Sequence, residues 1–84
     1  MHDVLVNTGT HVGKNCILNS KSLIEHDAVI GDHCHISTGS ILNGESKVGQ
    51  ESFVGSGAVI REGVKIGARS LVGGGATVMR DLLE

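Results

Sequence analysis

Three consecutive ionisable residues, Glu25-His26-Asp27, are the part of this sequence best suited to chemistry. They form a short turn-like segment, at a place where comparable segments of the chain carry glycine or asparagine. Those two residues adopt left-handed backbone conformations most readily, so their absence breaks a local rule. Departures from local preference are expected at functional sites, and a histidine beside a carboxylate is suited to act as a general base. We therefore expect the chemistry of this protein at Glu25-His26-Asp27.

The distribution of histidines supports a second hypothesis, a metal site. Four of the five histidines fall between residues 11 and 35. Histidine is a common zinc ligand, so a cluster of histidines is compatible with metal binding. The pairing of His26 with Asp27 favours a base over a ligand, and we expect no metal.

The elements that must position these residues follow a six-residue repeat. An α-helix repeats its apolar face near 3.6 residues and a single strand repeats every 2, so neither produces this period. A period of six held over almost the whole chain is typical of a repeat solenoid, in which short strands alternate with corners. The repeat consists of thirteen aliphatic residues: Val6, Val12, Leu18, Ile24, Ile30, Ile36, Leu42, Val48, Val54, Ile60, Ile66, Val72 and Val78.

Three hexapeptides make a coil of 18 residues, which suits a triangular cross-section with three strands and three corners. Residues 1–84 then form one domain of between four and five coils. Aliphatic residues 18 positions apart stack inside the prism. The residue two places before each of them also points inward, and we expect it to be small because three walls converge there.

Outward-facing positions on two of the three walls are also largely apolar. Lines of apolar residues make a patch larger than a small soluble monomer leaves exposed. We therefore expect a homo-oligomer, and three-fold packing of prisms into a homotrimer covers these walls most simply. The residues concerned are Ile17, His35, Phe53 and Leu71 on one wall, and Leu5, Leu23, Ile41, Val59 and Thr77 on another.

Composition excludes several classes of protein. The net charge of −2 argues against a general nucleic-acid binder. The longest purely apolar run has three residues, so we expect no transmembrane helix and no membrane partner. The two cysteines, Cys16 and Cys34, occupy the same small-residue position of successive coils, and we interpret them as small buried thiols. A cytoplasmic protein is the natural inference.

The six-residue pattern resembles the hexapeptide-repeat acyltransferases, whose fold is a single-stranded left-handed parallel β-helix. Residues 24–37 narrow the resemblance, because His26-Asp27 is followed by His33 and His35. This spacing, with Asn19 before it, is similar to the sialic acid O-acetyltransferase and UDP-amino-sugar N-acetyltransferase family. Members of that family usually carry an N-terminal α/β domain that helps to hold the sugar, and these 84 residues contain no counterpart of it.

The resemblance implies a catalytic group built on His26. In that family His26 corresponds to the general base and Asp27 to the carboxylate that orients it, while Asn19 supports the same site. Histidine is suited to this role because the unperturbed pKa of an imidazole is about 6.5. No serine or cysteine nucleophile is required, so we expect direct acetyl transfer within a ternary complex.

The resemblance also implies acetyl-CoA as the acyl donor. His35 corresponds to a residue that contacts the thioester or the pantetheine. Ser56 and Gly74 occupy matching corners of successive coils, where the CoA chain lies against backbone groups in the family. The expected acceptor is an amino or hydroxyl group of a sugar or nucleotide-sugar, and the sequence does not choose between N- and O-acetylation.

Two other hypotheses remain open at the level of sequence. The repeat alone is equally compatible with a structural or assembly module that has no catalytic activity. A γ-class carbonic anhydrase shares the β-helix and binds zinc through histidines, but His26, His33 and His35 do not match the ligand spacing of that family.

Overall fold

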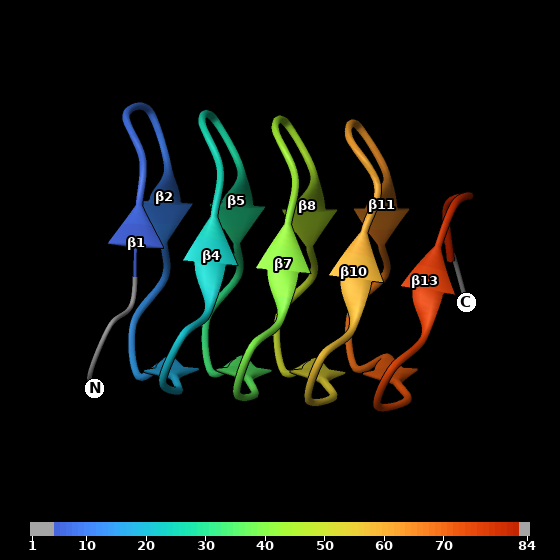
Figure 1. Ribbon diagram of the computed structural model, residues 1–84. Helices are drawn as coiled ribbons and strands as arrows, with labels where there is room; N and C mark the ends of the chain where they lie inside the picture. Colours follow the sequence, from blue (N-terminus) through green and yellow to red (C-terminus); the bar gives the residue numbers. More distant parts are fainter. Residues whose placement is uncertain (1–4, 83–84) are drawn as a thin grey trace.

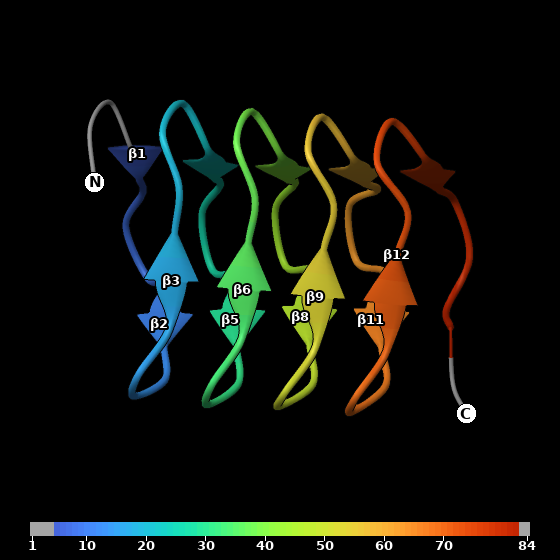
Figure 2. The same ribbon diagram turned by 90° about the horizontal axis from the view of Figure 1, so that it is seen from below.

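The computed structural model describes residues 5–82 as a stack of triangular coils (Figures 1 and 2). Within this range the regular structure consists of thirteen strands of two residues each, joined by short corners. Successive strands along the chain belong to different walls, so each wall is made of every third strand. The fold is a left-handed parallel β-helix: the repeat predicted the triangular coils, and the family resemblance implied their handedness.

The three walls are parallel sheets whose strands run in order along the stack. Each residue pairs with the residue 18 positions later, as in Leu23↔Ile41. The first wall contains β1 (Leu5–Val6), β4 (Leu23–Ile24), β7 (Ile41–Leu42), β10 (Val59–Ile60) and β13 (Thr77–Val78). The second contains β2 (His11–Val12), β5 (Val29–Ile30), β8 (Lys47–Val48) and β11 (Lys65–Ile66). The third contains β3 (Ile17–Leu18), β6 (His35–Ile36), β9 (Phe53–Val54) and β12 (Leu71–Val72).

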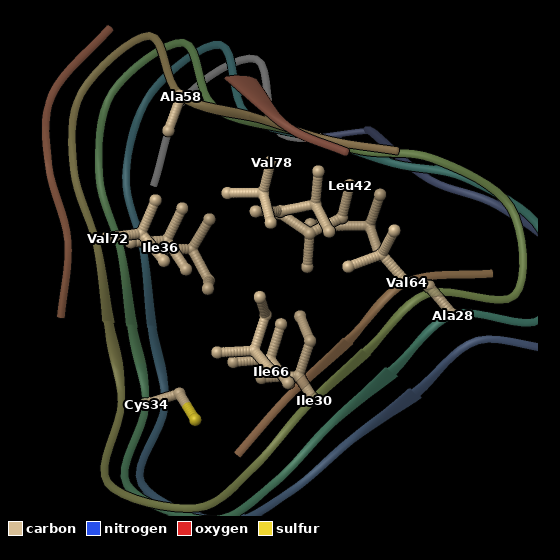
Figure 3. Packing of buried hydrophobic residues seen from close by; sticks show 14 of the residues in the cluster. Ala28, Ile30, Cys34, Ile36, Leu42, Ala58, Val64, Ile66, Val72 and Val78 are labelled. Carbon is tan, nitrogen blue, oxygen red and sulfur yellow. The ribbon is translucent and has the colours of Figure 1, made fainter. Parts of the chain in front are cut away.

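The predicted six-residue repeat forms the core of the prism. In Figure 3, Leu42, Ile36 and Ile30 point inward from the first, third and second walls. Every repeat residue from Leu18 to Val78 is buried, whereas Val6 and Val12 in the first coil are 44% and 38% exposed. The core is therefore continuous along the stack and open at its N-terminal coil. No helix able to span a membrane occurs in residues 5–82.

Small residues fill the corners of the core, as the sequence predicted. Cys34 is buried and donates its thiol hydrogen to the Gly49 carbonyl at 3.1 Å. Burial raises the pKa of the Cys34 thiol, because the thiolate would lose its hydration. Cys16 is only half-buried, and both thiols are free. The two cysteines therefore act as small packing residues.

The corners correct one interpretation of the sequence. At each described corner the left-handed residue is the second residue of the turn, and seven of these residues are not glycine. Asp27 is one of them, with φ 58°, and Lys21, His33 and Glu51 adopt the same conformation. The prediction that only Glu25-His26-Asp27 lacks a glycine or asparagine in this role is therefore wrong. The backbone conformation of that corner is ordinary for this protein.

Many glycines near the corners instead allow successive coils to approach closely. A Cβ placed on Gly31 would lie 2.6 Å from the Gln50 nitrogen, and one on Gly49 would lie 2.5 Å from the Ala68 nitrogen. Real Cβ atoms do not approach backbone atoms so closely. The glycines therefore serve two purposes: some allow the close spacing between coils, and others, such as Gly39 with φ 72°, supply the left-handed residue of a turn.

Two buried serines give a direct test of this packing. Ser46 is fully buried and its hydroxyl has no hydrogen-bond partner among residues 5–82, whereas Ser40 donates to the Ser37 and Gly55 carbonyls at 2.7 and 2.9 Å. We expect Ser46→Ala to raise the free energy of unfolding by about 1 kcal/mol and Ser40→Ala to lower it by about the same amount. Urea denaturation followed by circular dichroism measures both. Equal destabilisation by the two substitutions would contradict this account.

Candidate functional site

The edge between the first and second walls carries His26. We call this edge the first corner; four of its turns stack directly on one another through the 18-residue register. The residue at the first turn position varies widely in size along the edge. In order, the stacked turns are Thr8-Gly9, His26-Asp27, Gly44-Glu45 and Glu62-Gly63.

Backbone hydrogen bonds fix the turn that presents the His26 and Asp27 side chains. The Asp27 nitrogen donates to the Thr8 carbonyl of the preceding coil at 3.0 Å. The His26 carbonyl accepts from the Glu45 nitrogen of the following coil at 3.0 Å. The turn is thus anchored on both sides, and its two side chains project from a rigid edge.

The His26 and Asp27 side chains meet at the surface. His26 Nδ1 lies 3.4 Å from Asp27 Oδ2, and both side chains are more than half exposed. This distance is longer than a typical N–H···O bond, and an exposed pair adds little to stability. Its effect is on orientation: when Nδ1–H donates to the carboxylate, Nε2 carries the lone pair. In that tautomer of the neutral ring, Nε2 can accept a proton.

A second group of predicted residues lies on the third wall. The His35 ring packs against Phe53 of the next coil, with the ring centroids 4.8 Å apart. Its Nε2 lies 3.0 Å from Asn19 Nδ2. With the Asn19 amide as donor, Nε2 accepts and the ring proton is on Nδ1. Asn19 was expected beside His26, but in a single copy its side chain bonds to His35 and fixes the orientation of that ring.

Ser56 and Gly74 lie at the edge that joins the third wall to the first, here called the third corner. Both residues are exposed at the first position of their turns. The two turns stack directly on each other, since the Gly75 nitrogen donates to the Ser56 carbonyl at 2.8 Å. Among residues 5–82, neither the Ser56 nor the Gly74 backbone N–H has an acceptor. These two amides are therefore available to donate to a ligand that lies along the edge.

The six predicted residues therefore fall into two groups in one copy of the chain. His26 and Asp27 form what we call the corner half-site. The wall half-site, on the third wall and third corner, consists of Asn19, His35, Ser56 and Gly74. In a triangular prism the first corner lies opposite the third wall, with the buried core between them. One copy cannot present both half-sites to the same small ligand.

Glu25 has a supporting role that the sequence reading did not assign. Its side-chain Oε1 accepts from Asn7 Nδ2 at 3.0 Å, and its carbonyl accepts from the Thr10 hydroxyl at 2.9 Å. Both partners belong to the preceding coil, so these bonds hold the residue before His26 in place. The 18-residue register, which places Asn7 directly beside Glu25, is the signal that identifies this pair. In residues 5–82, no three His, Cys, Asp or Glu side chains are grouped to hold a metal.

The repeat matches a known family over nearly its full length. The family model is described as bacterial transferase hexapeptide (six repeats), and it matches residues 2–44 and 45–80. The chain belongs to this family. The 18-residue coils of this hexapeptide-repeat protein are thus groups of three family repeats. No curated protein sequence matches the chain significantly.

Solved structures of acetyltransferases share the fold of this hexapeptide-repeat protein. A histidine-to-asparagine mutant of perosamine N-acetyltransferase from Caulobacter crescentus, in complex with CoA and GDP-perosamine, is 38% identical over 94% of this chain, with a TM-score of 0.93. PerB from the same organism, with the same two ligands, is 30% identical over 98% of the chain, with a TM-score of 0.73. This chain spans 38% and 48% of those two proteins.

A third structure supports the fold alone. The acetyltransferase domain of PglB from Neisseria gonorrhoeae FA1090, in complex with acetyl coenzyme A, has a TM-score of 0.81. It is 24% identical over 98% of this chain, which spans 49% of that domain's chain. The hexapeptide-repeat coil is thus retained at low sequence identity.

The Asn19–His35 contact makes a testable prediction about the His35 tautomer. We expect neutral His35 to carry its proton on Nδ1, and Asn19→Ala to shift the proton toward Nε2, because the amide donor is lost. Long-range ¹H–¹⁵N spectra of the imidazole nitrogens measure this shift. Asn43→Ala is the matched control, since the Asn43 side chain donates to the Ile60 carbonyl on a different wall. An unchanged His35 tautomer in Asn19→Ala would show that the contact has no orienting effect.

Proposed function

We propose that this chain is the β-helical part of an acetyltransferase that moves the acetyl group of acetyl-CoA to an amino or hydroxyl group of a sugar or nucleotide-sugar. The observation that carries the proposal is the corner half-site, where an exposed histidine contacts a carboxylate through Nδ1 at 3.4 Å. Membership of the hexapeptide transferase family supports it. The CoA and GDP-perosamine bound to the similar Caulobacter enzymes support the choice of donor and acceptor class.

In the proposed reaction His26 is the general base. The acceptor nitrogen or oxygen attacks the thioester carbonyl carbon, and His26 Nε2 takes the proton that the nucleophile loses. The C–S bond then breaks, and the proton passes from the imidazolium to the departing CoA sulfur, so charge and atoms balance. Asp27 holds the Nδ1–H tautomer and stabilises the imidazolium while it exists.

The wall half-site is proposed to hold the donor. The backbone amides of Ser56 and Gly74 are free to bond to the amide groups of a pantetheine chain. Gly74 leaves room for this approach, because a Cβ there would meet only Ser56 backbone atoms, at 3.3 Å or more. His35, held by Asn19, stands on the same face of the prism and is proposed to contact the thioester.

The two half-sites can meet only if two copies of the chain combine, and we propose a homotrimer. Apolar side chains on the third wall remain uncovered in one copy: Ile17 is 50% exposed, Phe53 39% and Leu71 76%. On the first wall, Leu23, Ile41 and Val59 are also partly exposed. Packing these walls between copies would bury both apolar columns and bring His26 of one copy toward His35 of the next.

The role of His26 is tested by substitution. We expect His26→Ala to lower kcat by about 10²-fold or more, because the proton acceptor is lost. Release of CoA, measured with a thiol reagent in the presence of amino-sugars, nucleotide-sugars and sialic acids, reports the rate. His11→Ala is the control, since His11 is an exposed histidine on the second wall with no assigned role. Near-wild-type turnover of His26→Ala would rule out this assignment.

The shared site is tested by mixing two inactive variants. We expect His26→Ala and His35→Ala trimers, unfolded and refolded together in equal amounts, to recover about a quarter of the wild-type rate. This value follows because about three quarters of random trimers are mixed, and each mixed trimer rebuilds one site in three.

The two variants mixed without unfolding are the control, since folded trimers recover activity only to the extent that their subunits exchange. Absence of recovery after co-refolding, with trimers formed, would place His26 and His35 in separate roles.

A further inference from the structure

We propose that Gly44 is a positioning residue for His26, an inference that rests on the proposed function. By lacking a side chain, Gly44 lets the His26 imidazole lie over the following coil.

The geometry at Gly44 is specific to the His26 ring. A Cβ on Gly44 would lie 2.7 Å from His26 Nε2, 2.9 Å from Cε1 and 3.3 Å from Cδ2. The first atom of any side chain at position 44 would therefore overlap the ring where it now lies, so the ring would have to move.

Neither backbone conformation nor coil spacing requires a glycine at this position. The left-handed residue of the turn is Glu45, with φ 62°, and the backbone of Gly44 is outside that region. The first turn position of this corner accepts side chains in the other coils, as Thr8 and Glu62 show. At Gly31 and Gly49 an added Cβ would strike backbone atoms, whereas at Gly44 the nearest three atoms all belong to the His26 ring.

The absence of a side chain at Gly44 is therefore explained by the His26 ring beside it. His26 is more than half exposed, so its ring could turn away from an added methyl group at little cost to folding. Turning would move Nε2 from its place beside the following coil and weaken the contact between Nδ1 and Asp27. Because a misplacement of about 1 Å can cost about 10²-fold in rate, a single methyl group here should affect catalysis more than stability.

Gly44→Ala tests the proposal, with Gly73→Ala as the matched control. Gly73 also has an ordinary φ, and an added Cβ there meets nothing within 4 Å. Both variants should fold with wild-type thermal stability. We expect Gly44→Ala to shift the His26 imidazole signals in ¹H–¹³C and ¹H–¹⁵N spectra and to change the rate of His26 modification by diethyl pyrocarbonate. Gly73→Ala should leave both readouts unchanged.

Kinetics then separate a positioning role from a structural one. We expect Gly44→Ala to lower kcat by about 10- to 100-fold while the KM for acetyl-CoA stays unchanged. Introduced into His26→Ala, the same substitution should cause no further loss, because it acts through the ring. A full additional loss in that background would contradict the proposal.

The outcomes distinguish this inference from the proposed function. Acetyl transfer by the wild-type protein with an unchanged kcat in Gly44→Ala would overturn the role of Gly44 and leave the function standing. Shifted His26 signals in Gly44→Ala, with no acetyl transfer by the wild-type protein to any acceptor tested, would overturn the function. In that case the steric relation between Gly44 and His26 would stand without a catalytic meaning.

Discussion

Backbone hydrogen bonds between successive coils place each residue directly beside the residue 18 positions away. The bond from the Glu25 nitrogen to the Leu42 carbonyl, at 2.9 Å, is one of a series that runs along all three walls. These bonds join successive coils rather than residues adjacent in sequence. The neighbours of each side chain are therefore the residues 18 positions before and after it. The core, the corners and the candidate site all depend on this register.

The register explains how chemistry is placed on so uniform a scaffold. Along the first corner, His26 stands between Thr8 and Gly44, and its properties depend on both coils. The preceding coil supplies the carbonyl that anchors Asp27, and the following coil supplies the vacancy for the imidazole ring. A solenoid of this kind can change its function at one corner without altering its core, because the inward and outward columns are independent.

The same regularity limits what one copy can do. A prism has convex edges and flat walls, so groups on a corner and on the opposite wall cannot converge on a ligand. His26 and His35 are arranged in this way, and the apolar column of Ile17, Phe53 and Leu71 lies beside His35. Under the proposed function, assembly of several copies would bury the apolar column and complete the site through the same contact.

The sequence by itself determined the architecture and the identity of the candidate base. The aliphatic repeat from Val6 to Val78 was sufficient to predict the coils. Inward positions of a β-helix accept only residues that fit between three walls, so the repeat is visible in the sequence. Only the tertiary structure decided which side chains meet. It paired Asn19 with His35, and it placed Gly44 under the His26 ring. It also showed that Asp27 shares its left-handed backbone with several other corners. Side-chain directions, and contacts between residues 16 to 18 positions apart, depend on the neighbouring coil. The linear order of the residues does not show how that coil's side chains are placed.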